Sequence, residues 1–265
     1  MSFEVKNFFD NDDIVCAERK GVFAVMEYKR DLSVFPDTAA AAYFCSEMNV
    51  RKRLLACRLR NQKVTIQAGA MQWMLGNLQA STGVKGVGDL FSKAIKSKAS
   101  GESAIKPEYS GDGILVLEPT YKYLLLEDLS DWGGSVVLDD GLFLASESTV
   151  NHKIVARSNV SSALLGREGL FNLCLTGQGI VALESNVPRE ELIEINLDND
   201  VIKIDGNMAI AWSSTLNFTV ERTTKTLIGS AASGEGLVNV YRGTGKILMA
   251  PVGRFITSAP PTNRA

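Results

Sequence analysis

The sequence predicts an all-β protein, and three observations lead to this prediction. A Gly-x-Gly pair followed by apolar residues occurs at residues 111–113, 177–179 and 243–245, at two intervals of 66 residues. A second, glycine-led apolar stretch lies upstream of each pair and begins at Gly69, Gly141 and Gly206. Other short apolar runs alternate with Gly, Asn and Asp turns, as in β-sandwiches and barrels. Together these features indicate a threefold internal repeat that forms one β body.

The Gly-x-Gly segments predict strands that are buried on both faces. Each of these segments ends in at least three successive apolar residues, a pattern typical of covered strands. Pro119 and Pro251 mark where strand pairing stops, because proline donates no backbone hydrogen bond. We expect the glycines to allow positive φ or close backbone approach at a turn entering each strand: Gly111, Gly113, Gly177, Gly179, Gly243 and Gly245. No helix follows them, which argues against a dinucleotide site.

The glycine-led stretches predict strands with one buried face. Their apolar residues occupy alternate positions, as one buried face requires. These residues are Met71 and Trp73 in the first stretch, Phe143 and Ala145 in the second, and Met208, Ile210 and Trp212 in the third. Trp73 and Met74 are expected in the core. The distance to the following Gly-x-Gly is 42, 36 and 37 residues, and an inserted helical turn or mobile loop at residues 93–103 explains the longer first spacing.

The remaining elements complete a single β body. We expect further strands at residues 22–28, 64–67, 192–197, 201–204 and 216–220. Short helices are predicted at residues 38–46 and 89–98, with Asp37 or Thr38 as the cap of the first. The predicted boundaries are an N-terminal extension at 1–45, a β body at 46–257 with repeats at about 46–130, 131–195 and 196–257, and a disordered tail at 258–265.

Composition restricts the class of protein. The 265 residues are 45% hydrophobic, enough for a substantial core, and the net charge of -2 gives no global attraction to nucleic acid or anionic membrane. Four cysteines form no Cys-x-x-Cys pair, and the N-terminus lacks the features of a secretory signal. No apolar run reaches the roughly 20 residues of a membrane-spanning helix. We therefore expect a cytoplasmic protein with reduced thiols and no membrane span.

The sequence contains no recognisable catalytic or metal-binding pattern. His152 is the single histidine and lies in a polar stretch, so we expect it to be exposed and not a general base. The acidic residues Asp10, Asp12 and Asp13 lack the later ligands of a calcium loop and predict a solvated turn. Residues 83–88 lack the Gly-Lys-Ser/Thr of a phosphate loop and predict a flexible connection. We expect no enzyme activity, no cofactor and no metal.

One segment carries an uneven charge. Between residues 48 and 88 there are no acidic residues, while the basic residues include Arg51, Lys52, Arg53, Arg58, Arg60 and Lys63. Such a cluster can bind phosphate groups of a nucleic acid. The alternative is a solvated strand or a subunit contact that faces the acidic residues Glu190, Glu191, Glu194, Asp198 and Asp200. We favour the alternative, because the net charge is negative and no aromatic residues alternate with the basic ones.

The chain resembles a known family in residues 67–76, 83–88, 101–103 and 111–119. Over about residues 53–251 it is similar to the altered-inheritance-of-mitochondria (mitochondrial biogenesis) family, most specifically in residues 69–73. The resemblance implies a fold similar to the trp RNA-binding attenuation protein, a short double-stranded β-helix of three repeats. It implies no catalytic residues.

The expected function is that of a non-enzymatic β scaffold that oligomerises and binds another macromolecule. A trimer is the favoured assembly, because three similar units suit a ring, and the protein partner is not identified. The alternative is binding of nucleic acid or an anionic surface through residues 51–63. A third possibility is an enzyme or small-ligand binder that uses the mouth of the β body.

Overall fold

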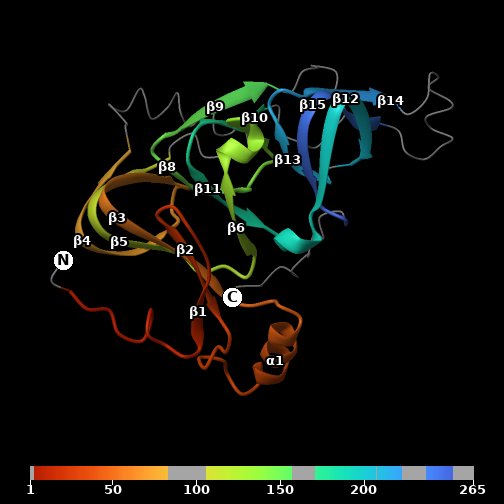
Figure 1. Ribbon diagram of the computed structural model, residues 1–265. Coiled ribbons are helices and arrows are strands. Elements are labelled where there is room, and N and C mark those ends of the chain that lie inside the picture. The colour runs from red at the N-terminus through yellow and green to blue at the C-terminus, as the bar shows by residue number, and fades with distance from the viewer. Residues whose placement is uncertain (1–2, 83–105, 157–170, 207, 223–236, 253–265) are drawn as a thin grey trace, which may run out of the picture.

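The computed structural model describes residues 3–82, 106–156, 171–206, 208–222 and 237–252. Within these ranges the protein consists of strands in two sheets, one α-helix and two short 3-10 helices. Figure 1 shows two curled sheets next to each other, with the helix α1 apart from both. The all-β class is confirmed.

The first sheet has the strand order β1-β2-β3-β8-β11-β6, and β5 pairs with both β3 and β4. All these pairs are antiparallel. Its strands are β1 (Ile14–Lys20), β2 (Phe23–Tyr28), β3 (Arg53–Ile66), β4 (Met71–Ser81), β5 (Glu108–Leu117), β6 (Tyr123–Asp128), β8 (Phe143–Glu147) and β11 (Ile180–Ser185).

The second sheet has the order β12-β15-β13-β7-β10-β9, and β14 also pairs with β15. Its strands are β7 (Ser135–Leu138), β9 (Val150–Ala156), β10 (Phe171–Gly177), β12 (Ile193–Asp205), β13 (Ala209–Ser213), β14 (Asn217–Arg222) and β15 (Leu237–Met249). The 3-10 helices are η1 (Leu129–Trp132), between β6 and β7, and η2 (Arg189–Glu191), before β12.

The first and third Gly-x-Gly segments lie within β5 and β15, which corrects the prediction of a turn that enters a strand. The middle segment is a bend between β10 and β11, as predicted. Gly111 has a φ of 125°, and a Cβ there would lie 2.1 Å from the carbonyl oxygen of Asn77. Gly177 has a φ of 118°, and its Cβ would lie 2.6 Å from the carbonyl oxygen of Thr149. The predicted close backbone approach is therefore confirmed at these two glycines, where the neighbouring backbone leaves no room for a side chain.

The three Gly-x-Gly segments have similar strand neighbours. β5 lies between β3 and β4, and β15 pairs with β12 on one side and with β13 and β14 on the other. In the middle segment, β10 lies between β7 and β9, and β11 between β6 and β8. The threefold repeat, the double-stranded β-helix and the likeness to the trp RNA-binding attenuation protein stay predictions.

A local hydrogen bond recurs at two of these segments. The left-handed residue Asn61 donates its backbone N–H to Oδ1 of Asp112, the middle residue of the first Gly-x-Gly, at 3.0 Å. Asn199, also left-handed, donates its backbone N–H to Oγ1 of Thr244 at 2.9 Å. Both asparagines lie at irregularities of the neighbouring strand, so β3 and β12 bend where they pass the glycines. The strands predicted at residues 192–197 and 201–204 are consequently one bent strand, β12.

A shared core joins the two sheets. Leu138 and Leu175 of the second sheet have no exposed surface and belong to the same apolar cluster as the fully buried Leu183 of the first sheet. The chain passes from β10 to β11 through residues 177–179, so the middle segment belongs to both sheets. The four residues Ile114, Leu115, Val116 and Leu117 are also buried, which confirms the predicted covered strand.

The glycine-led stretches are partly as predicted. Phe143 and Ala145 are buried. Met74, however, is 45% exposed, which corrects its predicted place in the core. Trp73 is half-buried, and its ring centre lies 5.8 Å from that of Phe8 in the N-terminal segment. The reason is topological, because β4 pairs only with β5 in the described part of the chain and is a sheet edge.

The first 45 residues contribute two strands and most of α1 (Ala39–Glu47). β2 matches a predicted strand and pairs with β3, which joins this segment to the first sheet. The first predicted helix is confirmed, although Thr38 makes no capping bond and instead donates its hydroxyl to the carbonyl oxygen of Phe35. The predicted domain boundaries stay predictions. The helix at 89–98, the insertion at 93–103, the connection at 83–88 and the tail at 258–265 lie outside the described residues.

Replacing Gly111 by Ala should lower the free energy of unfolding by at least about 2 kcal/mol, because the new methyl group meets the Asn77 carbonyl in a left-handed backbone. The control is Gly69→Ala, where φ is 80° but a Cβ meets nothing within 4 Å, and about 1 kcal/mol is expected. Urea unfolding measures both. Equal losses of unfolding free energy in the two variants would show that the close approach at Gly111 does not affect stability.

Candidate functional site

Four of the six predicted basic residues are neutralised by acidic partners. Arg51 and Arg53 contact Glu27 at 3.1 and 2.8 Å. The other two pairs join Lys52 to Asp31 at 2.6 Å and Lys63 to Glu108 at 3.2 Å. These pairs form within the chain, and the predicted subunit contact with acidic residues at 190–200 stays a prediction. Strand register explains the pairing with Glu27, because Glu27 on β2 lies directly opposite Arg53 on β3.

Arg53 is a structural residue. Only 3% of it is exposed. Its Nε donates to Glu27 and one Nη donates to Oδ1 of Asn49, both at 2.8 Å, while the guanidinium lies 4.4 Å from the centre of the Tyr123 ring. These contacts tie β3 to β2 and β6, so this arginine is not available for a ligand.

Arg58 and Arg60 are the two predicted residues that remain available. Both are exposed, and within the described residues neither forms an ion pair. They share a face of β3 with Ala56, because side chains alternate along a strand. This face is turned away from the apolar cluster that contains Leu59. The Arg58 guanidinium lies 5.8 Å from the ring centre of Phe9.

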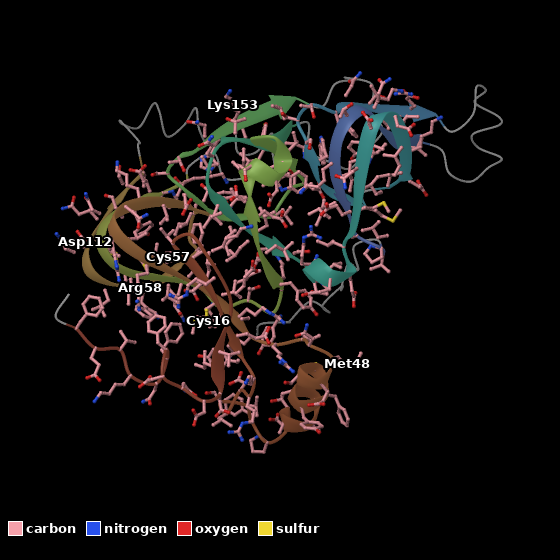
Figure 2. The ribbon with its side chains drawn as sticks, viewed as in Figure 1. Cys16, Met48, Cys57, Arg58, Asp112 and Lys153 are labelled. Carbon is pink, nitrogen blue, oxygen red and sulfur yellow. The ribbon has the colours of Figure 1, made fainter. Side chains whose placement is uncertain are left out.

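A groove of about 450 Å³ lies on this outer face of the first sheet. Arg58 and Arg60 line it together with Arg19 of β1, a residue that no sequence pattern indicated. We name it the arginine groove, and its lining includes Arg19, Arg58, Arg60, Phe9, Val22, Ile114 and Glu147. A hollow of about 360 Å³, lined by Phe3 and three of the same residues, adjoins it. Figure 2 shows Arg58 on the side of the sheet where the N-terminal segment runs.

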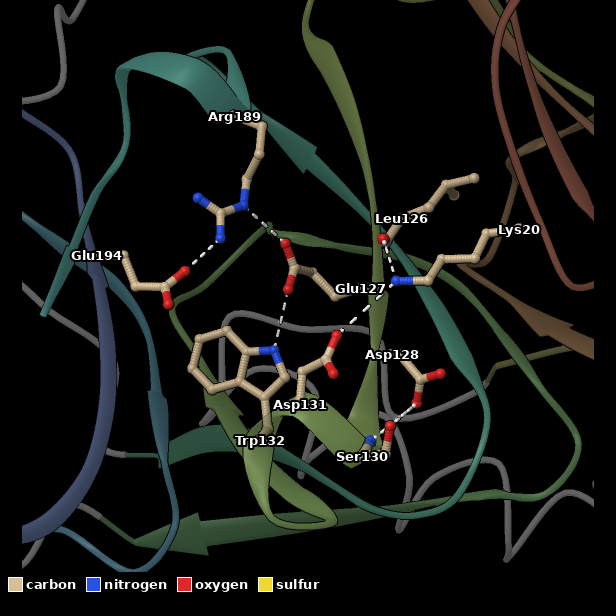
Figure 3. Close-up of polar contacts among 9 residues, drawn as sticks. All are labelled: Lys20, Leu126, Glu127, Asp128, Ser130, Asp131, Trp132, Arg189 and Glu194. Carbon is tan, nitrogen blue, oxygen red and sulfur yellow. Dashed lines mark hydrogen bonds and ion pairs between the residues drawn. The ribbon is translucent and has the colours of Figure 1, made fainter. Parts of the chain in front are cut away.

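Another hollow, of about 370 Å³, lies between β1, β6 and η2, and most of its charged side chains form ion pairs within the chain. Glu127, which is buried, accepts hydrogen bonds from Nε1 of Trp132 and Nε of Arg189, each at 3.1 Å. Arg189 also binds Glu194, and Lys20 donates to the carbonyl oxygen of Leu126 at 3.5 Å. Figure 3 shows this network. It links η1, η2 and β12, and we interpret it as structural.

His152 is half-buried on β9, which corrects the prediction of an exposed residue. Its Nε2 is hydrogen-bonded to Oγ of Ser146 at 3.0 Å, and its ring packs edge-on against Phe143. Burial, and secondarily the charge of Lys106, lower the pKa of His152 to about 4. The imidazole is therefore neutral at pH 7. Pairing of β9 with β10 places this polar stretch in the sheet.

The cysteines and the acidic residues near the N-terminus do not form a reactive site. All four cysteines are unpaired, and burial raises the pKa of the Cys57 thiol. Asp13 forms an ion pair with Arg30. No group of three His, Cys, Asp or Glu side chains in the described ranges could hold a metal ion. Among the same residues, no helix has the length and apolar character needed to cross a lipid bilayer.

An exposed apolar surface surrounds α1. None of the residues of this helix is buried. In residues 32–50, which we name the α1 segment, five large apolar side chains are between 63% and 76% exposed: Leu32, Phe35, Tyr43, Phe44 and Met48. Figure 2 shows Met48 next to the helix and apart from both sheets. The sequence did not indicate this surface, because an Ala-rich helix with aromatic residues also suits a core.

Comparisons with known proteins identify relatives. A family model described as mitochondrial biogenesis AIM24 matches residues 47–252. An uncharacterized protein of Streptococcus pyogenes serotype M6 is 30% identical over 192 residues, which cover 69% of this chain and 75% of that protein. The crystal structure of a Streptococcus pyogenes protein matches with a TM-score of 0.57 at 27% identity, and the match covers 78% of this chain and 90% of that one. Neither name states a ligand, partner or reaction.

Replacing Arg53 by Met should lower the free energy of unfolding by about 3–5 kcal/mol, because it removes one partner of a buried ion pair. Arg58→Met on the same strand is the control and should change it by no more than about 0.5 kcal/mol. Urea unfolding followed by circular dichroism distinguishes the two. A harmless Arg53 variant would contradict the structural role.

Stability should also depend on pH through His152. Its folded-state pKa of about 4 lies below the ordinary value of 6.5, so the contribution of the neutral imidazole is complete above pH 6.5 and is lost as the pH falls toward 4. Between pH 7.5 and pH 5 we expect a loss of about 2 kcal/mol. His152→Gln should remove most of this loss in urea unfolding. If the unfolding free energy of the variant fell with pH as steeply as that of the native chain, the predicted effect of burying the His152 imidazole would be wrong.

Proposed function

Because the chain belongs to the mitochondrial biogenesis AIM24 family, we propose that it is a non-enzymatic β scaffold that oligomerises and binds another macromolecule. The α1 segment is the observation that carries this proposal. Contiguous apolar surfaces on soluble proteins mark sites of association, because water contact with such surfaces is unfavourable. Five large apolar side chains on an unburied helix and its flanks form a surface of this kind.

Sheet edges give a second route to assembly. In the described part of the chain, β4 pairs only with β5 and β12 pairs only with β15, which leaves one edge of each strand open. Open edges can pair with strands of another chain. We favour a trimer, because the three similar units expected from the sequence suit a ring of three subunits. The cytoplasm is the proposed location.

The absence of catalysis is proposed from the surroundings of the single histidine. Its partner Ser146 has no exposed surface, so this hydroxyl is not placed to meet a substrate. The imidazole has a pKa of about 4, which makes it a weak general base at pH 7. We interpret the pair as a hydrogen bond that satisfies two polar groups inside the sheet.

The alternative function, binding of nucleic acid or an anionic surface through residues 51–63, has less support. Four of its six basic side chains are held in ion pairs with acidic residues of the same chain. A phosphate backbone would have to break those pairs to be bound. Only Arg58 and Arg60 remain for a long polyanion, which is few contacts for stable binding.

Size-exclusion chromatography with light scattering tests the assembly. We expect the native chain to be an oligomer and the triple variant Phe35→Ser, Phe44→Ser, Met48→Ser to be a monomer with unchanged circular dichroism, because none of the three side chains contributes to a core. Ile154→Ser, at an exposed apolar position on β9, is the control and should remain oligomeric. A monomeric native chain would overturn the proposed oligomer, and an oligomeric triple variant would exclude the α1 segment as its interface.

A further inference from the structure

Three guanidinium groups without acidic partners line the arginine groove. Arg19 belongs to β1, and Arg58 and Arg60 belong to β3, with β2 between these strands. In the described ranges none of the three forms an ion pair, whereas the nearby Arg51, Lys52, Arg53 and Lys63 all do. The fold thus neutralises the surrounding cations and leaves three together on one concave surface.

The wall and floor of the groove are apolar. The buried residues Ala24, Ala56 and Ile114 line it, and so does Phe9 of the N-terminal segment. Toward the adjoining hollow, Phe3 continues the apolar surface past Ile114. Volumes of about 450 and 360 Å³ are in the range that small ligands occupy.

The acidic groups near the groove do not cancel its charge. Glu147 lines the groove, but its two carboxylate oxygens accept hydrogen bonds from the backbone N–H groups of Val22 and Ile180. Asp112 lies opposite Arg60 in the strand register and accepts a hydrogen bond from the backbone N–H of Asn61. Three arginines against these two carboxylates leave a positive charge.

This combination selects a ligand chemistry. Guanidinium groups donate paired hydrogen bonds to carboxylate and phosphate oxygens, and such charge-assisted bonds are stronger than neutral ones. The apolar surface from Phe9 through Ile114 to Phe3 favours a ligand that also carries a hydrocarbon part. We propose that the arginine groove binds a small amphipathic oxyanion, with its phosphate or carboxylate head at Arg58 and Arg60 and its apolar chain along Ile114.

This site is separate from the proposed scaffold surface. The α1 segment and the groove share no residues, so ligand binding and oligomer formation can fail independently. The site also differs from a nucleic-acid surface, because the ligand enters a hollow and gains from its apolar part.

Isothermal titration calorimetry of the native chain with n-octyl phosphate tests the proposal. We expect one ligand per chain and binding at least tenfold weaker in Arg58→Ala, Arg60→Ala, since charge-assisted hydrogen bonds contribute about that factor or more. The matched control removes two charges elsewhere, in Lys63→Ala, Lys153→Ala, and should bind within about twofold of the native chain. Figure 2 shows Lys153 at the top of the view, apart from Arg58. Equal thermal unfolding of both variants and the native chain verifies their folding.

Further probes separate the parts of the ligand and its source. Inorganic phosphate and n-octyl glucoside should each bind at least tenfold more weakly than n-octyl phosphate, because each lacks one half of the proposed chemistry. Vesicles of phosphatidylglycerol in phosphatidylcholine identify the source of the ligand. Co-sedimentation that depends on Arg58 and Arg60 would show that the head group belongs to a lipid. Binding of n-octyl phosphate without co-sedimentation would show that the ligand is a free small molecule. No binding of n-octyl phosphate, equal binding of n-octyl glucoside, or equal weakening in the two double variants would overturn the proposal.

Discussion

The fold depends on places where one strand passes so close to its neighbour that no side chain fits. At Gly111 a Cβ would lie 2.1 Å from the carbonyl oxygen of Asn77 on the adjacent strand, and at Gly177 one would lie 2.6 Å from that of Thr149 in the turn before β9. β3 bends beside Gly111 and β12 bends beside Gly243, where Asn61 and Asn199 take left-handed conformations. Bending at these points curls each sheet around its own apolar residues, because a strand that bends can cover both sides of a core. The middle segment, which passes from β10 to β11, joins the two sheets through a shared core.

Strand pairing in this framework decides which basic residues lie beside acidic ones. Antiparallel pairing of β2 with β3 places Glu27 beside Arg53, and the following turn places Asp31 beside Lys52. A buried guanidinium requires such a partner, because an isolated charge in an apolar surrounding is very unfavourable. Arg58 and Arg60 lie on β3 beyond Phe23, the first residue of β2, so no acidic residue of β2 faces them. The arginine groove is in this sense a consequence of where β2 begins.

Two surfaces of the first sheet and its extensions therefore differ in chemistry. The α1 segment exposes five large apolar side chains, which suits another protein surface. The arginine groove combines positive charge with apolar walls, which suits a small amphipathic ligand. The N-terminal segment contributes to the groove through Phe3 and Phe9, so residues before the family match at 47–252 take part in it. Phe8 of the same segment packs against Trp73 at the open edge of the sheet.

Local patterns predicted much of the fold and little of the candidate site. The apolar residues after each Gly-x-Gly indicated covered strands, and Ile114 to Leu117 are buried accordingly. Arg58 and Arg60 could be proposed from the run of basic residues, but Arg19 and Phe9 could not, since they are about 40 residues or more away in the sequence and join the site only through strand pairing. His152 was misjudged for a similar reason, because its polar neighbours in sequence are not its neighbours in space.

The sequence by itself determined the β class, the positions where glycine is required and the residues that avoid water. These properties depend on the backbone freedom and hydrophobicity of each residue and its immediate neighbours. Only the tertiary structure decided which cations are paired, that His152 is half-buried and which apolar side chains stay exposed. Those outcomes depend on strand order and register, which are set by contacts between residues far apart in the chain, and charge and burial are properties of those contacts.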